Sequence, residues 1–180
     1  ARVALTDASS FSATADGETV YFASLAWDWR RPGMGEAVSD LYRLTVRTGK
    51  ITRVTRGAHL WQPAVSEDGL RLAAVQADGP YSSLVSVDPE SGRTTELYAR
   101  QGTNVFTPSF SPGGLSLVFT LNERGFQDIC LLPLTGPEAG KTRLLTGPDR
   151  NGEYYPAFLD EGRVIFSSDR TGSQCLYTVD

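Results

Sequence analysis

The chain has 180 residues and a formal net charge of −4, and 40% of its residues are hydrophobic. This length allows one domain with a buried core, and no apolar run approaches the roughly 18 to 20 residues that a membrane-spanning helix needs. Lysine and arginine are interspersed with acids, which excludes the clustered basic stripe of a nucleic-acid-binding protein. We therefore expect no nucleic-acid partner, no membrane span and, because residues 1–7 carry no apolar stretch, no signal peptide in this chain.

A short hairpin recurs along the chain. Its first copy, over 11–22, turns at Asp16-Gly17, and copies that begin with a proline follow over 63–75, 108–120 and 156–166. The turn glycines are spaced by 52, 45 and 48 residues, at Gly17, Gly69, Gly114 and Gly162. Periods of about 40 to 50 residues that are built from strands and turns are typical of β-propeller blades.

Each repeat continues with further predicted strands. Third strands are expected over 40–46, 82–87, 128–134 and 174–179, and fourth strands over 50–55, 93–98 and 142–146. Four antiparallel strands, named a to d from the axis outward, make one blade. We predict an all-β propeller domain over 1–180 with four blades' worth of strands: repeats at 7–55, 56–98, 99–146 and 147–180, and 1–6 as a strand d. It is either a closed four-bladed ring, with 1–6 completing the last blade, or a piece of a larger propeller.

The recurring residues have a structural explanation. The glycines at 69, 114 and 162 are expected to supply turn conformations that other residues resist. The prolines at 63, 108 and 156 are expected to fix φ where strand a begins and no ladder donor is lost. Function is therefore expected where the repeat fails.

The repeat resembles that of TolB-type propellers, most closely over 166–172 and 142–147 and also over 40–50. The resemblance implies a bacterial protein that is periplasmic or otherwise exported. Similar repeats occur in TolB, in the propellers of prolyl-oligopeptidase-like peptidases and in some polysaccharide lyases. It implies three alternatives: a non-enzymatic binding scaffold, which we favour, the gating domain of a larger peptidase, and a glycan-active enzyme.

The sequence shows no catalytic constellation. His59 is the only histidine, so a Ser-His-Asp triad or a zinc site would have to use it. No Gly-x-Ser-x-Gly elbow is present. Turn aspartates are spread one per blade, which is typical of turn formers, and we expect no metal and no cofactor.

A protein partner or small ligand is expected at the face that the b–c and d–a loops share. An insertion at 25–36 breaks the first repeat and carries tryptophans and arginines, which are enriched at binding hot spots. The candidate binding residues are Trp27, Trp29, Arg30, Arg31, His59, Trp61, Phe106 and Tyr154. The insertion could instead cap the axial channel or form a mobile loop. The aromatic residues at 61, 106 and 154 recur two residues before a proline, so they could instead pack between blades.

The two cysteines, Cys130 and Cys175, fall in strands of different repeats. Different blades rarely bring Cα atoms within the roughly 7 Å that a disulfide needs. We expect buried or half-buried free thiols.

Overall fold

A computed structural model describes residues 8–27, 37–147 and 151–180, which fold into four antiparallel sheets. The first sheet contains β1 (Ala8–Ala13), β2 (Thr19–Trp27), β3 (Ala37–Thr45) and β4 (Lys50–Arg53). The second contains β5 (Leu60–Val65), β6 (Leu72–Asp78), β7 (Tyr81–Val87) and β8 (Thr94–Tyr98). The third contains β9 (Thr103–Phe110), β10 (Ser116–Glu123), β11 (Phe126–Pro133) and β12 (Arg143–Leu144). The fourth contains β13 (Glu153–Phe158), β14 (Val164–Ser168) and β15 (Cys175–Val179).

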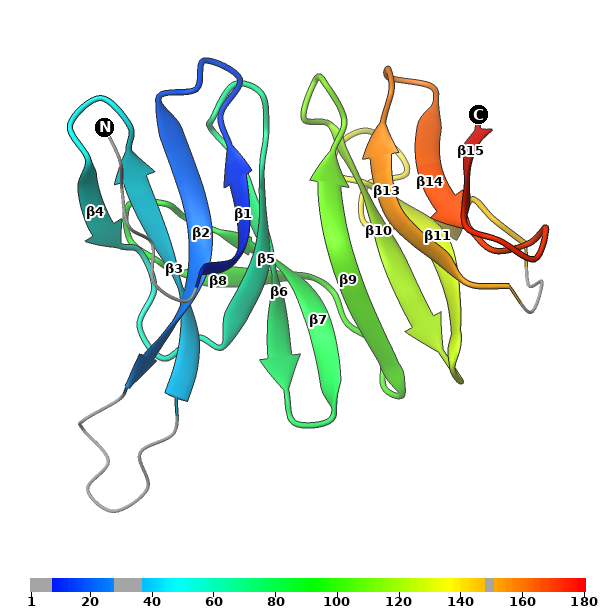
Figure 1. The fold of residues 1–180 in the computed structure, drawn as a ribbon, viewed down its shortest axis with the longest axis horizontal. Helices are drawn as coiled ribbons and strands as arrows, with labels where there is room; N and C mark the ends of the chain where they lie inside the picture. The colour runs from blue at the N-terminus through cyan, green and yellow to red at the C-terminus, as the bar shows by residue number, and fades with distance from the viewer. Residues whose placement is uncertain (1–7, 28–36, 148–150) are drawn as a thin grey trace.

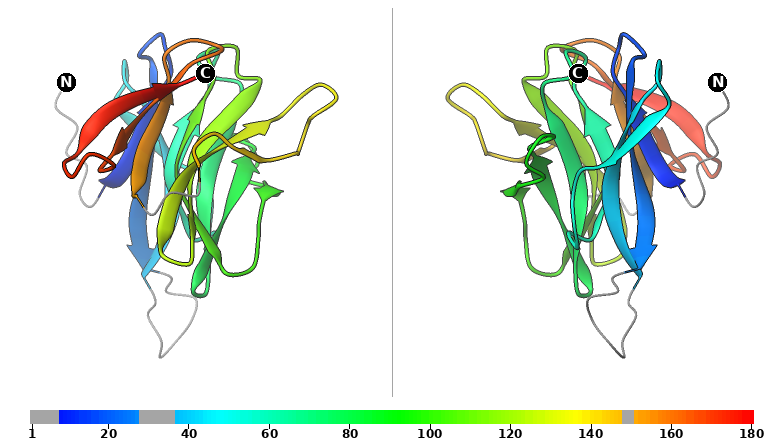
Figure 2. Two further views of the ribbon diagram at one scale, coloured as in Figure 1. Left: turned by 90° about the vertical axis from the view of Figure 1, so that its right-hand side faces the viewer. Right: turned by 90° about the vertical axis from the view of Figure 1, so that its left-hand side faces the viewer.

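The sheets stand side by side like blades of a propeller (Figure 1). Their first strands, β1, β5, β9 and β13, contact one another in sequence order. Figure 2 shows that the first and fourth sheets bend toward the same side, so the described residues form an arc. The all-β propeller architecture is thus confirmed. The predicted strand over residues 2–6 lies outside the described residues.

Apolar side chains are buried between neighbouring sheets because successive residues of a strand point to opposite faces. In β6, Leu72 and Ala74 pack toward the first sheet, whereas Ala73 and Val75 pack toward the third. A further cluster, including Ile129 from β11 and Phe166 from β14, joins the third and fourth sheets. Each sheet is therefore stabilised by its neighbours instead of by a core of its own.

A β-bulge interrupts strand a where the repeated proline lies. The registers of β5, β9 and β13 shift so that two residues oppose one on the neighbouring strand. The residue before each proline, Gln62, Thr107 or Tyr155, has a left-handed φ between 47° and 54°. The prolines were predicted at the start of strand a, but they lie inside it, at the bulge, where the ladder is already interrupted.

Side chains at this bulge connect neighbouring sheets. Ser10 Oγ accepts a hydrogen bond of 2.8 Å from Gln62 N, and Gln62 Oε1 accepts one of 2.7 Å from Thr107 N. The N–H at the bulges of β5 and β9 is therefore satisfied by the preceding sheet. These bonds hold a backbone conformation that non-glycine residues otherwise avoid.

The a–b turns differ in one respect from the prediction. Gly17, Gly69 and Gly114 have φ between 67° and 71°, as a left-handed turn residue requires, but Gly162 is not left-handed. Asp160 shapes this turn instead, because its Oδ1 accepts hydrogen bonds of 2.9 Å from both Gly162 N and Arg163 N.

Both cysteines are free. Cys130 is buried, and burial together with the nearby charge of Asp128 raises its pKa to about 12. Cys175 is exposed on β15, contrary to the prediction, because no fourth strand covers this edge within the described residues. The described ranges also contain no helix that could cross a membrane.

Candidate binding face

The b–c and d–a loops lie together at one end of the sheets, the lower end in Figure 1. We call this end the binding face. Among the described residues it is formed by the ends of β2 and β3, by the connections β6–β7 and β10–β11, and by the segments that lead into β5 and β9. The a–b and c–d turns lie at the other end.

The two strands that flank the insertion reach the binding face as a regular ladder. The β2–β3 ladder runs without a break from Thr19↔Thr45 to Trp27↔Ala37. Strand β2 therefore includes residues 25–27, which were predicted to belong to the insertion. Trp27 ends the ladder, whereas Trp29, Arg30 and Arg31 lie outside the described residues.

His59 lies on the binding face, beside the base of this hairpin. Its side chain is exposed, and its φ of 54° places it in the left-handed region. His59 O accepts a hydrogen bond of 3.0 Å from Ala77 N, while Ser39 Oγ of β3 donates one of 2.6 Å to the next carbonyl, Leu60 O. The backbone at His59 is therefore tied to both the first and the second sheet.

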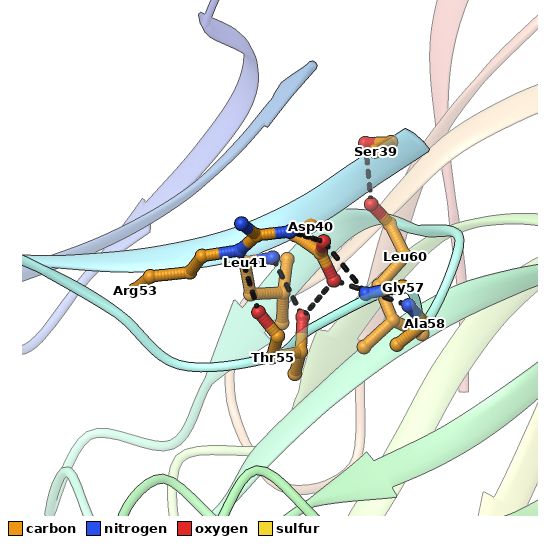
Figure 3. Close-up of polar contacts among 8 residues, drawn as sticks. All are labelled: Ser39, Asp40, Leu41, Arg53, Thr55, Gly57, Ala58 and Leu60. Atoms are coloured by element: carbon orange, nitrogen blue, oxygen red, sulfur yellow. Dashed lines mark hydrogen bonds and ion pairs between the residues drawn. The ribbon is translucent and has the colours of Figure 1, made fainter. Parts of the chain in front are cut away.

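A buried carboxylate anchors the d–a loop that leads to His59 (Figure 3). Asp40 is fully buried, and its two oxygens accept hydrogen bonds from Thr55 Oγ1 (2.6 Å), Arg53 Nη2 (2.6 Å), Gly57 N (2.9 Å) and Ala58 N (3.1 Å). Burial alone would raise the pKa of Asp40, but these hydrogen bonds outweigh it and lower the pKa below its ordinary value.

Sequence reasoning missed Asp40, although the repeat contained a signal. Asp128 occupies the corresponding place in the third sheet. Thr146 Oγ1 accepts from Ile129 N at 2.9 Å, just as Thr55 Oγ1 accepts from Leu41 N at 3.0 Å. The aspartate before an apolar residue in strand c and the threonine after strand d thus recur together, and the bond from the threonine to strand c is the part that both sheets share.

Two predicted aromatic residues meet between sheets. Trp61 of β5 and Phe106 of β9 pack edge to face, with ring centroids 5.7 Å apart and an interplanar angle of 83°. Both side chains are half-buried. This contact matches the alternative in which the repeated aromatic packs between blades. Trp61 Nε1 is buried and has no hydrogen-bond acceptor among the residues that the structure describes.

Tyr154 lies on β13, far along the arc from Trp61. Its ring covers Gly152, where an added Cβ would stand 2.1 Å from the Tyr154 hydroxyl. The next residue, Tyr155, was expected on the same face and is 71% exposed. The described residues thus bring Trp61 and Phe106 into contact, with His59 two residues before Trp61 and Tyr154 set apart in the fourth sheet.

A second buried carboxylate, also not predicted, lies at the junction of the third and fourth sheets. Glu153 occupies the place that Leu60 and Val105 hold in the other repeats, and its side chain is 3% exposed. Glu153 Oε1 is paired with Arg170, whose guanidinium stacks on the rings of Phe166 and Tyr177 at 5.3 and 4.7 Å from their centroids. Glu153 Oε2 and Gln127 Oε1 are buried without a partner in the described part of the chain.

Within the described ranges, no three His, Cys, Asp or Glu side chains converge on a point where a metal ion could bind. The turn aspartates hold their own turns instead: Asp16 Oδ1 accepts from Thr14 Oγ1 at 2.6 Å, and Asp68 Oδ1 accepts from Ser66 Oγ at 2.5 Å.

No known protein family matches the sequence, and comparison with curated proteins found no relative. Solved structures do match. A putative TolB from Agrobacterium tumefaciens is 19% identical with a TM-score of 0.72, and the match covers 94% of this chain and 56% of that one. TolB from Acinetobacter baumannii is 15% identical with a TM-score of 0.69, covering 93% of this chain and 40% of that one. A puromycin-hydrolyzing peptidase from Mycobacterium tuberculosis is 17% identical with a TM-score of 0.65, covering 94% and 36%.

These similarities concern the fold. The chain spans 40% and 56% of the two TolB chains, so it corresponds to part of each. Four antiparallel sheets in an arc, without a helix in the described residues, agree with this match. The chain has the fold of a TolB-like β-propeller.

Proposed function

We propose that the chain is a non-enzymatic propeller scaffold that binds a protein partner or a small ligand through the binding face. The observation that carries this proposal is the unbroken β2–β3 ladder, which ends at Trp27↔Ala37 and so supports the tryptophan- and arginine-containing insertion on a regular base. The exposed His59 lies beside that base, because Ser39 of the hairpin is bonded to Leu60.

Residue chemistry favours recognition over catalysis at this place. Tryptophan and arginine supply large desolvated contacts and directional hydrogen bonds. A scaffold held by sheet ladders and by the Asp40 anchor does not have to order its backbone when a partner binds, which leaves more of the contact energy as affinity. By resemblance, we place the protein in the periplasm or another exported compartment.

The test is quantitative capture of partner proteins by the immobilised chain. Replacing Trp29 and Arg31 together by alanine should reduce the captured partner by about tenfold or more. The matched control replaces Arg47 and Leu159, an arginine and an exposed leucine on turns at the opposite end. Equal capture by the wild type and the Trp29/Arg31 variant, with unchanged thermal unfolding, would reject the site.

A second candidate is the gating propeller of a larger peptidase. The structural match to the puromycin-hydrolyzing peptidase over 94% of this chain supports this alternative. A gating role predicts an adjoining α/β-hydrolase domain in the parent protein, and cleavage of a peptide substrate by that longer protein. The absence of such a domain would remove this candidate.

The glycan-active alternative shares its fold with an oligogalacturonate lyase from Vibrio parahaemolyticus. Lyase assays on oligogalacturonate would test it.

A further inference from the structure

We propose that the groove between the second and third sheets binds an extended, acidic and apolar peptide segment of a protein partner. The groove has a volume of about 790 Å³. Its lining comes from the turn before β6, one face of β8, and the ends of β9 and β11, and includes Leu70, Arg71, Arg93, Leu97, Phe110 and Leu134. It lies at the end of the molecule opposite the binding face and so is independent of the function proposed above.

The groove is open because one c–d turn differs from its counterpart. Between the first and second sheets, the turn at 88–92 packs against the first sheet: Arg43 pairs with Glu90 at 2.5 Å, and a Cβ on Gly92 would stand 2.2 Å from Val54 O. The corresponding segment of the third sheet, 134–142, is longer. Figure 2 shows the connection between β11 and β12 reaching away from the sheets. The second and third sheets therefore keep an uncovered cleft.

The floor of the groove is apolar. Leu97, Phe110 and Leu134 are partly buried against the core cluster between the second and third sheets. Leu72 and Val87 also line the groove, but their side chains belong to the cluster between the first and second sheets. Leu70 stands at the rim and is 76% exposed. Apolar side chains of an occupant would lose contact with water here, and Leu70 would be covered with them.

The charges of the groove complement an acid. Its charged lining residues are two arginines and one aspartate, on a chain whose net charge is −4. Asp88 is engaged in its own turn, since its Oδ1 accepts hydrogen bonds from Glu90 N (3.0 Å) and Ser91 N (2.7 Å). Arg71 Nη1 donates to Gly114 O. Arg93 is exposed, and the charge of Asp88 acts on it, but no hydrogen bond or close ion pair holds its guanidinium within the described residues, so it can also pair with a carboxylate of an occupant.

The shape and the neighbouring strand favour a peptide as the occupant. The lining belongs to exposed turns and a sheet face, so an occupant lies across a surface trench. Strand β8 is the outermost strand of its sheet, and its outer edge has no partner strand in the described part of the chain. An extended peptide beside β8 finds main-chain donors and acceptors there as well as pockets for alternate side chains.

The experiment uses two labelled octapeptides, one alternating leucine with glutamate and one alternating leucine with lysine, in fluorescence anisotropy titrations. We expect saturable binding of the glutamate peptide only, weakening with salt. Arg93→Glu should weaken it by about five- to tenfold, and Leu70→Ser by about threefold. The matched controls Arg47→Glu and Leu115→Ser, at an exposed arginine and at the residue equivalent to Leu70 in the third sheet, should keep the wild-type affinity.

Several results would overturn the proposal. These are no saturable binding, equal binding of both peptides, or unchanged affinity in both Arg93→Glu and Leu70→Ser. Full displacement by an equimolar aliphatic carboxylate would assign the groove to a small amphiphile, and self-association that Arg93→Glu abolishes would assign it to a second copy. The Trp29/Arg31 variant should bind the peptide normally, which separates this inference from the proposed function.

Discussion

Two sheet junctions contain a buried carboxylate, but the two carboxylates differ in how many hydrogen-bond partners they have. Between the first and second sheets, Asp40 accepts four hydrogen bonds, and the Ser39–Leu60 bond lies beside it. Between the third and fourth, Glu153 is paired only with Arg170, and its second oxygen has no partner among the described residues. Both charges are desolvated, but only the first is compensated in full. The same repeat thus produces a saturated junction and an incompletely satisfied one.

The largest effect should come from removing the saturated carboxylate. Asp40→Ala leaves two N–H groups, a hydroxyl and a guanidinium without their acceptor, so we expect the free energy of unfolding to fall by about 3–5 kcal/mol. Urea denaturation measures it. Asp16→Ala removes an exposed turn aspartate and should lower the free energy of unfolding far less than Asp40→Ala. A similar loss in both variants would contradict the role assigned to Asp40.

The packing between the first and second sheets can be tested with substitutions that leave every charged residue in place. Gly92 has a φ of 70°, and a Cβ there would stand 2.2 Å from Val54 O, so Gly92→Ala should destabilise the chain by about 2–4 kcal/mol. Gly49 has a φ of 69° with no atom within 4 Å of its Cβ position. Gly49→Ala should therefore show only the backbone cost of about 1 kcal/mol. Thermal or urea unfolding of the two variants separates the cost of the steric contact with Val54 from the cost of the left-handed backbone conformation.

Acid should weaken the first junction. The folded pKa of Asp40 lies below its unfolded value, so its stabilisation is complete above the unfolded pKa of about 3.9 and is lost as the pH falls through the folded pKa. The free energy of unfolding of the wild type should therefore decrease below about pH 4 more steeply than that of Asp40→Asn. Parallel curves for the two proteins would show that other carboxylates cause the acid sensitivity.

The smallest effect is expected at the incompletely satisfied junction. Glu153→Leu places there the residue type that Leu60 provides in the second sheet, and should change the free energy of unfolding by less than about 1 kcal/mol in either direction. Arg170→Ala, which leaves the buried carboxylate without its partner, should destabilise more than Glu153→Leu. A cost of several kcal/mol for Glu153→Leu would show that Glu153 is as well compensated as Asp40.

The sequence predicted the repeating architecture well, because a glycine turn and alternating strands follow from local residue chemistry. Most third and fourth strands lie where they were expected, although β12 is only two residues long. The contact of Trp61 with Phe106 could also be anticipated, since both precede a proline by two residues.

Other features could not be predicted because they depend on contacts between repeats. The residue before a proline normally adopts an extended conformation, so the left-handed Gln62 and Thr107 follow only from bonds to the preceding sheet. Acids usually lie at the surface, and the burial of Glu153 follows from its packing at the junction of the third and fourth sheets, where Leu60 and Val105 are buried in the other repeats. The groove likewise depends on how one turn packs, which composition does not encode.

The bonds at the bulges have a consequence for protein engineering. Ser10 accepts a hydrogen bond from the backbone of the second sheet and Gln62 accepts one from that of the third, so the first and second repeats each carry an acceptor that the following repeat uses. A repeat is therefore not an interchangeable module. Moving it elsewhere removes the acceptor side chain that the next repeat needs for the N–H at its bulge. In shuffled or consensus versions of this chain, the segment boundaries should keep each acceptor side chain in the same segment as the bulge N–H that it binds.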